Sequence, residues 1–234
     1  MGTLDRKAAE EQNERILEYI RAGITSGKYP PNQKINQAEV ANELGVSRTP
    51  VIKALGKLES EMLVNNVPNS GYFVREYTLK DMLETYEIRQ SIEMVAVYKA
   101  AKKAKPEDIE ELKSCFRPFE GKEKIDVDDY VQADKKFHAK LLTFCDNERL
   151  NRINNAMNIM VWTYNQGLIR DPEITLSEHQ LIINAVEKGD AFLAKELMME
   201  HIQFSLDRLN TTCLDLEKMG ISSESIPYSN IPKI

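Results

Sequence analysis

The chain contains only three histidines, His138, His179 and His201, and all of them lie in its second half. Asp134 precedes His138 by four residues, so on a helix the carboxylate and the imidazole share one face. Imidazole and carboxylate ligands together suit a borderline divalent cation, with zinc preferred and nickel or manganese as alternatives. For each histidine taken alone, the competing interpretation is a surface residue or a core residue whose ring is hydrogen-bonded.

The segments that carry His179 and His201 have helical periodicity and are joined by the short connection Gly189-Asp190. Two helices joined so tightly are expected to be antiparallel neighbours. His179 lies ten residues before this connection and His201 eleven residues after it, so both imidazoles fall at the same level of the helical hairpin. We therefore predict that Asp134 and the three imidazoles converge inside a helical bundle and form a metal site.

The C-terminal part of the sequence has no strand signal after about residue 78. Thr78 is a cap residue for a long amphipathic helix, and breaks such as Asp171-Pro172 separate later helical stretches. The tail from about Gly220 is rich in Ser, Pro and Asn and is expected to be irregular. The pattern predicts six helices, over residues 79–104, 106–118, 127–145, 148–168, 175–188 and 190–217.

The N-terminal part has a different pattern. An amphipathic helix is expected over residues 9–26, and a short helix begins at Asn36 and ends at Gly45. Ser47 caps a third helix. The connection between the second and third helices is so short that they must cross steeply, as in a helix-turn-helix.

Two short strands, at 63–64 and 72–74, flank the turn Pro68-Asn69-Ser70-Gly71 and predict a β-hairpin wing. The fold class is therefore mainly α, with an N-terminal winged helix-turn-helix, a small β-hairpin wing and a C-terminal all-α helical bundle. We place the two domains at residues 1–77 and 78–218, with an irregular tail over 219–234.

The formal net charge of the chain is −6, and its mean hydropathy of −0.45 is typical of a soluble protein. Residues 1–77 contain ten basic and ten acidic residues, so the excess of acid belongs to the remainder. A neutral domain followed by an acidic one fits a DNA contact that is local. The sequence has no apolar run long enough for a membrane span, and Cys115, Cys145 and Cys213 lack CxxC spacing. We expect a cytoplasmic protein with reduced thiols and no membrane contact.

A helix-turn-helix reads DNA with its second helix, which enters the major groove with its first residues facing the base edges. Here those residues are Ser47, Arg48 and Thr49, followed on the outward face by Lys53. Arg48 can bind a guanine through two hydrogen bonds, whereas Ser47 and Thr49 suit phosphate. Gly71 at the wing tip would approach the DNA backbone or the minor groove. The competing interpretations are solvated surface charges and a winged helix that binds another protein.

The runs Gly45-Val46-Ser47-Arg48-Thr49-Pro50-Val51 and Pro68-Asn69-Ser70-Gly71-Tyr72-Phe73-Val74 closely resemble the GntR family of bacterial transcription regulators. The resemblance covers about residues 11–75 and implies that Arg48 is the main base-contacting arginine and Gly71 the wing glycine. Two positions depart from the family pattern. Ile52 stands where a second arginine is common, and Ser70 stands where an arginine or histidine often precedes the glycine. These departures bear on operator sequence and affinity, and Lys53 is a candidate replacement charge.

The second half, about residues 80–215, resembles the FCD domain, the ligand-sensing domain of one GntR subgroup. Members with four ligands at these positions usually bind a metal, so the resemblance implies one here. The six predicted helices resemble the shorter, VanR-like version, which implies an organic-acid or sugar-acid effector. The matching motifs are Asp134-Lys135-Lys136-Phe137-His138, Glu178-His179, Gly189-Asp190 and Met199-Glu200-His201-Ile202.

Arg89 matches a family arginine on the first helix of this domain. The resemblance implies that its guanidinium faces the carboxylate of the effector, which suits two-point carboxylate binding. The alternative is an Arg89–Glu93 pair on the helix surface. Further candidates to line the effector cavity are Asn154, Asn155, Asn158, Tyr164 and Arg170.

Together these features predict a DNA-binding transcription regulator that is controlled by a small carboxylate effector at or near the metal. The resemblance implies a repressor, because repression is the more common mode of regulation in the family. A homodimer would bind a pseudo-palindromic double-stranded operator. In one alternative the metal is purely structural or is itself the sensed signal. An enzyme is disfavoured because no motif places a general base beside the metal site. An architectural DNA binder would not need a second domain of this size.

Overall fold

The computed structural model describes residues 3–156 and 170–230, and the chain folds into two compact units. The first unit runs to Glu76, and the second contains Tyr77–Asn155 and the C-terminal helices. The prediction of a mainly α fold with a small hairpin is confirmed in both units.

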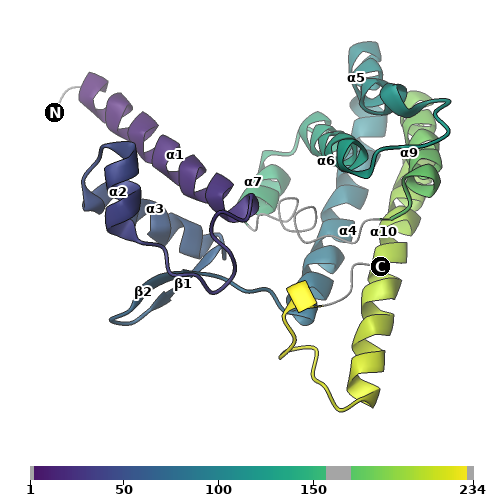
Figure 1. Ribbon diagram of the computed structural model, residues 1–234. Coiled ribbons are helices and arrows are strands. Elements are labelled where there is room, and N and C mark those ends of the chain that lie inside the picture. The colour runs from purple at the N-terminus through teal and green to yellow at the C-terminus, as the bar shows by residue number, and fades with distance from the viewer. Residues whose placement is uncertain (1–2, 157–169, 231–234) are drawn as a thin grey trace. The chain divides into compact units, whose positions relative to one another are not determined.

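The first unit consists of three helices and a two-stranded wing (Figure 1). The elements are α1 (Thr3–Thr25), α2 (Gln37–Leu44), α3 (Arg48–Ser60), β1 (Val64–Val67) and β2 (Gly71–Val74). Both α1 and α2 pack against α3, because each helix carries apolar residues at helical spacing on one face. The centre of this unit is formed by side chains that are at most 1% exposed: Ile16, Leu17, Ile20, Val40, Val51, Leu55 and Leu58.

The tight turn between α2 and α3 depends on its end residues. Asn36 caps α2 by accepting hydrogen bonds from the N–H groups of Ala38 and Glu39. Gly45 ends α2 with a φ of 65°, a left-handed conformation that glycine adopts without steric cost. Ser47 stands at the N-cap position of α3, but its side chain makes no capping hydrogen bond, so the expected cap is not formed. Its exposed hydroxyl lies at the start of α3.

The wing is longer than the sequence predicted. β1 and β2 pair antiparallel, with Val64 opposite Val74 and Val67 opposite Gly71. The backbone of residues 32–35 also pairs with β2, where the N–H of Val74 donates to the carbonyl of Gln33 at 2.9 Å. This third segment follows two prolines, which predict a loop. The sequence pattern therefore did not indicate that the segment pairs with β2.

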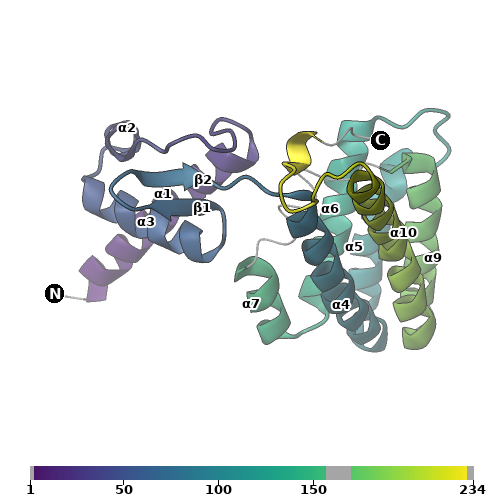
Figure 2. The ribbon, with the colours of Figure 1, turned by 90° about the horizontal axis from the view of Figure 1, so that it is seen from below.

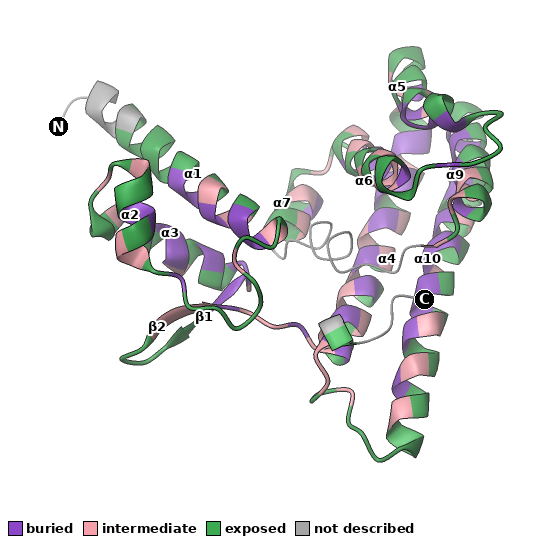
Figure 3. Cartoon of the chain, viewed as in Figure 1, coloured by how far each residue is buried: buried purple, intermediate pink, exposed green. Residues whose placement is uncertain are grey.

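The described residues of the second unit are helical apart from the connections and the tail (Figure 2). α4 packs against α10, α6 and α9, and α5 packs against α6 and α9. The buried faces of α4 and α10 are shown in purple in Figure 3. The helices of this unit are α4 (Leu79–Lys103), α5 (Pro106–Phe116), α6 (Val127–Phe144), α7 (Glu148–Ala156), α9 (Pro172–Glu187) and α10 (Ala191–Lys218), with short 3-10 turns η1 (Arg117–Phe119) and η2 (Tyr228–Asn230).

Capping residues set several helix boundaries in this unit. Thr78 and Asp81 form a reciprocal capping box at the start of α4. α9 begins at Pro172, a few residues before the predicted start, because Asp171 caps it and proline is favoured in the first turn. Of the helix predicted over 148–168, α7 is described, and residues 157–169 lie outside the described part of the chain.

The residues after α10 return to the start of α4. The N–H of Tyr228 donates to the carbonyl of Tyr77 at 2.7 Å, and the N–H of Leu79 donates to the carbonyl of Ile226 at 3.1 Å. Tyr228 is only 7% exposed and belongs to the hydrophobic core of this unit. The tail is therefore packed, although apart from η2 its described backbone is irregular.

Within residues 3–156 and 170–230, no helix is both long and apolar enough to cross a bilayer. The three cysteines are buried free thiols.

Candidate metal centre and DNA-binding helix

The four predicted metal ligands come from three helices of the second unit. Asp134 and His138 lie on α6, His179 on α9 and His201 on α10. One ligand atom from each residue lies within 4.8 Å of those from the other three. The three imidazoles are buried, while the Asp134 side chain is 17% exposed. The structure thus brings together all four side chains that were selected from the sequence.

The distances between the ligand atoms fit a divalent cation. Oδ1 of Asp134 lies 3.0 Å from Nε2 of His179 and 3.7 Å from Nε2 of His138. The two Nε2 atoms are 3.4 Å apart. Two nitrogens that each lie about 2.0–2.1 Å from a tetrahedral zinc are themselves roughly 3.3 Å apart. The donor types, and the spacing of the ligand atoms of Asp134, His138 and His179, are therefore compatible with zinc.

Burial makes the three imidazoles differ in their affinity for protons. It lowers the pKa of His179 to about 3, an effect that the nearby Asp134 carboxylate only partly offsets. It also lowers the pKa of His201, against the hydrogen bond to Glu178. For His138, burial is outweighed by the negative charge of Glu93, so its pKa is raised. Two of the three rings are thus held in the neutral form that a metal requires.

The carboxylates at the site are held ionised. Burial alone would raise the pKa of Asp134, but the adjacent His179 and His138 hold it well below its usual range. Burial opposes ionisation of Glu93 too, but His138 and Arg89 lower its pKa to about 2. An ionised Asp134 is the state that coordinates a cation.

The outer nitrogen of each ring has a partner that sequence reasoning missed. Nδ1 of His138 is hydrogen-bonded to Glu93, and Nδ1 of His201 donates to Glu178 at 2.6 Å. Nδ1 of His179 and the hydroxyl of Tyr130 are hydrogen-bonded at 2.9 Å. These contacts leave the Nε2 atoms as the ligand atoms. The only sequence signals were that Glu178 adjoins His179 and that Glu93 lies four residues after Arg89.

Arg89 is buried rather than on the helix surface. It is 5% exposed, and its Nε donates to Glu93 at 2.6 Å. The Arg89–Glu93 pair that the sequence offered as an alternative is therefore formed, but inside the bundle. Arg170 has the corresponding place beside Glu178, to which it donates at 2.5 and 2.8 Å.

Of the other four residues proposed to line the effector cavity, two lie in the described part of the chain. Asn154 and Asn155 lie on α7 and contact each other at 3.4 Å. Asn158 and Tyr164 fall outside the described residues.

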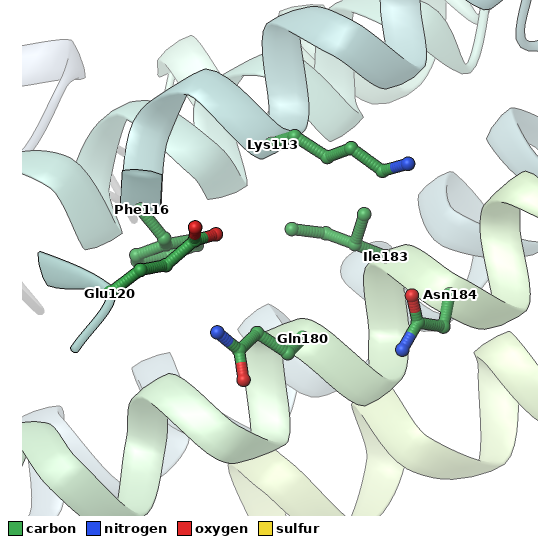
Figure 4. A pocket seen from close by; sticks show the side chains of 6 residues that line it. All are labelled: Lys113, Phe116, Glu120, Gln180, Ile183 and Asn184. Carbon is green, nitrogen blue, oxygen red and sulfur yellow. The ribbon is translucent and has the colours of Figure 1, made fainter. Parts of the chain in front are cut away.

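The ring of Phe116 contacts the candidate metal centre and also lines a nearby pocket. The ring of Phe116 stacks on His179, with centroids 4.6 Å apart and an interplanar angle of 10°. The pocket has a volume of about 230 Å³ and lies between α5 and α9 (Figure 4). None of the four candidate ligands lines this pocket. Its lining residues are Lys113, Phe116, Glu120, Gln180, Ile183 and Asn184.

The residues selected for DNA reading lie on an exposed surface. Ser47, Arg48 and Thr49 are exposed at the N-terminus of α3, and Lys53 is exposed one turn further on. Neither Arg48 nor Lys53 is paired with another of the described residues. Gly71 is half-buried, and its φ of 100° is a conformation that disfavours any side chain.

Two departures from the family pattern are also exposed. Ile52 is 43% exposed on α3, and Ser70 is exposed directly before Gly71. An apolar side chain therefore stands one turn from Arg48 on α3, and a short hydroxyl stands in the turn of the wing.

Comparison with known proteins gives consistent matches along the chain. Residues 12–74 match the model for bacterial regulatory proteins of the gntR family, and residues 84–204 match the model for the FCD domain. The uncharacterized HTH-type transcriptional regulator YdhC of Bacillus subtilis (strain 168) is 28% identical over 198 residues, 81% of this chain and 87% of that protein. The probable D-xylose utilization operon transcriptional repressor of Paenarthrobacter nicotinovorans is 28% identical over 191 residues, which cover 80% of this chain and 84% of that protein.

Among solved structures, E. coli McbR/YncC aligns with a TM-score of 0.69 and 19% identity, over 86% of this chain and 98% of that chain. This likeness supports the fold. The matching families and relatives are transcription regulators rather than enzymes. With a GntR-type helix-turn-helix followed by an FCD domain over more than half of its length, the chain belongs to the GntR family of bacterial transcription regulators, in the group with a C-terminal FCD domain.

Proposed function

We propose that this protein is a sequence-specific DNA-binding repressor whose operator affinity is controlled by a small organic acid or sugar acid. The effector binds at or near a metal ion in the FCD domain. The observation that carries this proposal is the convergence of Asp134 and three buried imidazoles, with ligand atoms within 4.8 Å of one another. Such a set is unusual in a core that has only a structural role, because burying three imidazoles and a carboxylate together is costly in desolvation.

Asp134, His138, His179 and His201 would hold the ion, with zinc preferred over nickel or manganese. When bound, a divalent ion supplies a localised positive charge and coordination positions for oxygen ligands. The protein's own contribution is to keep two rings neutral, to keep Asp134 ionised and to exclude most water from the site.

The charge around the site favours an anionic effector. The ionised groups are two arginines and three carboxylates. When all three imidazoles are neutral, as metal coordination requires, these groups give one net negative charge. A divalent cation changes this to one net positive charge, and buried surroundings strengthen its attraction for an anion. A carboxylate is the anion that best combines with such a site. The five groups are Arg89, Arg170, Glu93, Asp134 and Glu178.

Arg89 adds buried positive charge at the edge of this site. We propose that it attracts the effector carboxylate in addition to pairing with Glu93.

The DNA-binding half of the proposal rests on α3 and the wing. Arg48 contacts a base edge, and Ser47 and Thr49 contact phosphate, aided by the unpaired N–H groups at the helix start. Lys53 contributes a further phosphate contact, and the wing at Gly71 approaches the DNA backbone. Two such helices in a homodimer would read the half-sites of a pseudo-palindrome. The repressor name of the Paenarthrobacter relative supports the direction of regulation.

One alternative has a specific observation in its favour. The four ligands join α6, α9 and α10, so a metal there would cross-link three helices of the core. A metal could therefore stabilise the domain without contacting an effector, or could itself be the signal. If removal of the metal leaves both the fold and the effector response intact, the effector-at-metal version is wrong.

In vitro selection of random duplexes by the zinc-loaded protein, at one stated salt concentration, tests the DNA-binding half. We expect an enriched pseudo-palindrome from the wild type, and from Arg48→Ala a weaker enrichment that has lost the preference at the base position that Arg48 contacts. Arg152→Ala is the matched control, because Arg152 is an exposed arginine outside the DNA-binding unit. Failure of the wild type to enrich any sequence, with Arg48→Ala behaving identically, would contradict the proposal.

A further inference from the structure

The outer nitrogens of the three imidazoles have two kinds of partner. Nδ1 of His138 and Nδ1 of His201 each meet a glutamate, Glu93 and Glu178 respectively. Nδ1 of His179 meets the neutral hydroxyl of Tyr130. The glutamate-bound rings come from different helices, α6 and α10, and their partners come from α4 and α9.

Each glutamate is in turn held by an arginine. Arg89 donates from Nε to Glu93 at 2.6 Å, and both side chains are almost completely buried, at 6% and 1% exposure. Arg170 donates hydrogen bonds to Glu178 from two nitrogens, at 2.5 and 2.8 Å. Arg170 also donates to the backbone carbonyl of His201 at 3.0 Å, so it fixes the ligand's backbone as well as its partner.

A carboxylate controls which ring nitrogen carries the proton. An ionised glutamate can only accept hydrogen bonds, so the imidazole nitrogen that faces it must be N–H. The proton is then on Nδ1, and the lone pair of Nε2 points toward the centre. A tyrosine hydroxyl imposes no such choice, because it can either donate or accept. Tyr130 therefore does not fix the tautomer of His179, whereas the ionised Asp134, whose Oδ1 lies 3.0 Å from Nε2 of His179, favours the Nε2–H form in the metal-free protein.

We propose that Glu93 and Glu178, each held by its arginine, are positioning residues that fix two of the three imidazoles in the Nδ1–H tautomer before the metal arrives. His179, with its neutral partner, is the ring that must adjust on binding. This inference rests on the proposed metal site, and it assigns Arg89 and Arg170 a role in metal binding that is separate from any contact with the effector. Partners of this kind typically contribute about 10–100-fold to metal affinity.

Zinc affinity, measured by competition with a chromophoric chelator on the purified full chain, tests the inference. We expect Glu178→Gln and Glu93→Gln to bind zinc about 10–100-fold more weakly than the wild type. Tyr130→Phe should have a smaller effect. The matched control is Glu148→Gln, which breaks a surface Arg–Glu pair with side chains 78% and 79% exposed and should bind as the wild type does. Unchanged affinity in both glutamine variants would overturn the inference.

A second measurement separates positioning from loss of folding. Because the chain has only three histidines, the long-range ¹H–¹⁵N spectrum of the metal-free protein contains three imidazole signals. We expect His201 to be in the Nδ1–H tautomer in the wild type and to lose this preference in Glu178→Gln, the less buried of the two variants. An Nε2–H tautomer for His201 in the wild type would overturn the inference even if Glu93→Gln does not fold.

The same data distinguish this inference from the proposed function. A wild type that binds no zinc contradicts the metal site itself. A wild type that binds zinc, with glutamine variants that bind it equally well, contradicts only the positioning role.

Discussion

At the scale of single residues, the metal-free site makes the protein sensitive to acid. The pKa of His179 is lowered to about 3 and that of His201 is lowered too. As the pH falls, the unfolded chain therefore binds more protons at these two residues than the folded chain does. The free energy of unfolding therefore falls as the pH falls below about 6.5. His138 has a raised pKa. Its contribution to the free energy of unfolding is therefore complete below pH 6.5 and is lost as the pH rises through that raised pKa.

We predict that the metal-free protein loses about 2 kcal/mol of stability between pH 6.5 and 5 from His179 alone. Glu93 and Glu178, with pKa values of about 2, add to the loss only below about pH 4.5. Urea unfolding at several pH values measures this slope. Zinc-loaded protein should resist the loss until the metal is released. A metal-free stability that is constant or increases from pH 6.5 to 5 would show that the imidazoles are not buried in neutral form.

The exposed face of α3 gives a second prediction at this scale. Arg48→Ala should weaken operator binding by about 1–3 kcal/mol and relax the preference at one base position, because a two-point contact to a base is lost. Lys53→Ala should weaken binding to all sequences and reduce the slope of log affinity against log salt by about 1. Binding assays at several salt concentrations distinguish the two. An unchanged affinity, preference and salt slope in Lys53→Ala would exclude it as a replacement charge.

The metal ligands could be selected from the sequence, whereas their supporting residues could not. Only three histidines exist, and the helix period and the short α9–α10 connection fix how His179 and His201 align. Glu93 lies 45 residues from its partner His138. Whether its side chain points into the bundle depends on the rotation of α4 about its axis, which the packing of α6, α9 and α10 determines. An arginine and a glutamate four residues apart resemble a surface pair until that rotation is known.

At the scale of elements, the C-terminal tail holds the start of α4. Tyr228 is buried in the core, and the tail backbone is bonded to Tyr77 and Leu79, on either side of the Thr78 cap. We predict that Tyr228→Ala destabilises the second unit by about 2–3 kcal/mol, because a large aromatic side chain leaves the core. Met219→Ala, at a side chain 73% exposed beside the tail, is the matched control. Equal unfolding midpoints in urea for both variants would mean that the tail does not stabilise this unit.

Helices were predicted well where a cap and an apolar stripe coincide. α2, α3, α4, α6 and α10 begin or end within a few residues of the expected positions, because Asn36, Gly45 and Thr78 act as local stop and start signals. The pairing of residues 32–35 with β2 could not be predicted, since it depends on a contact between segments about 40 residues apart. The tail contacts escaped prediction for the same reason.

At the scale of the whole molecule, the proposed regulation is a coupling between two sites in different domains. Such couplings are typically worth about 1–3 kcal/mol, or roughly 5–150-fold in affinity. By linkage, the operator must change the affinity for the acid by the same factor as the acid changes the affinity for the operator. Both affinities can be measured with the same purified protein.

The most direct test is the operator affinity of the zinc-loaded protein with and without a panel of small organic and sugar acids, with citrate and gluconate among them. Asp134→Asn is compared with the wild type, because Asp134 is the one ligand that is partly exposed and its amide keeps the side-chain shape. The account predicts that at least one acid changes wild-type affinity by about 5–150-fold and leaves Asp134→Asn and zinc-stripped protein unchanged. An acid that shifts the affinity of all three equally would contradict it.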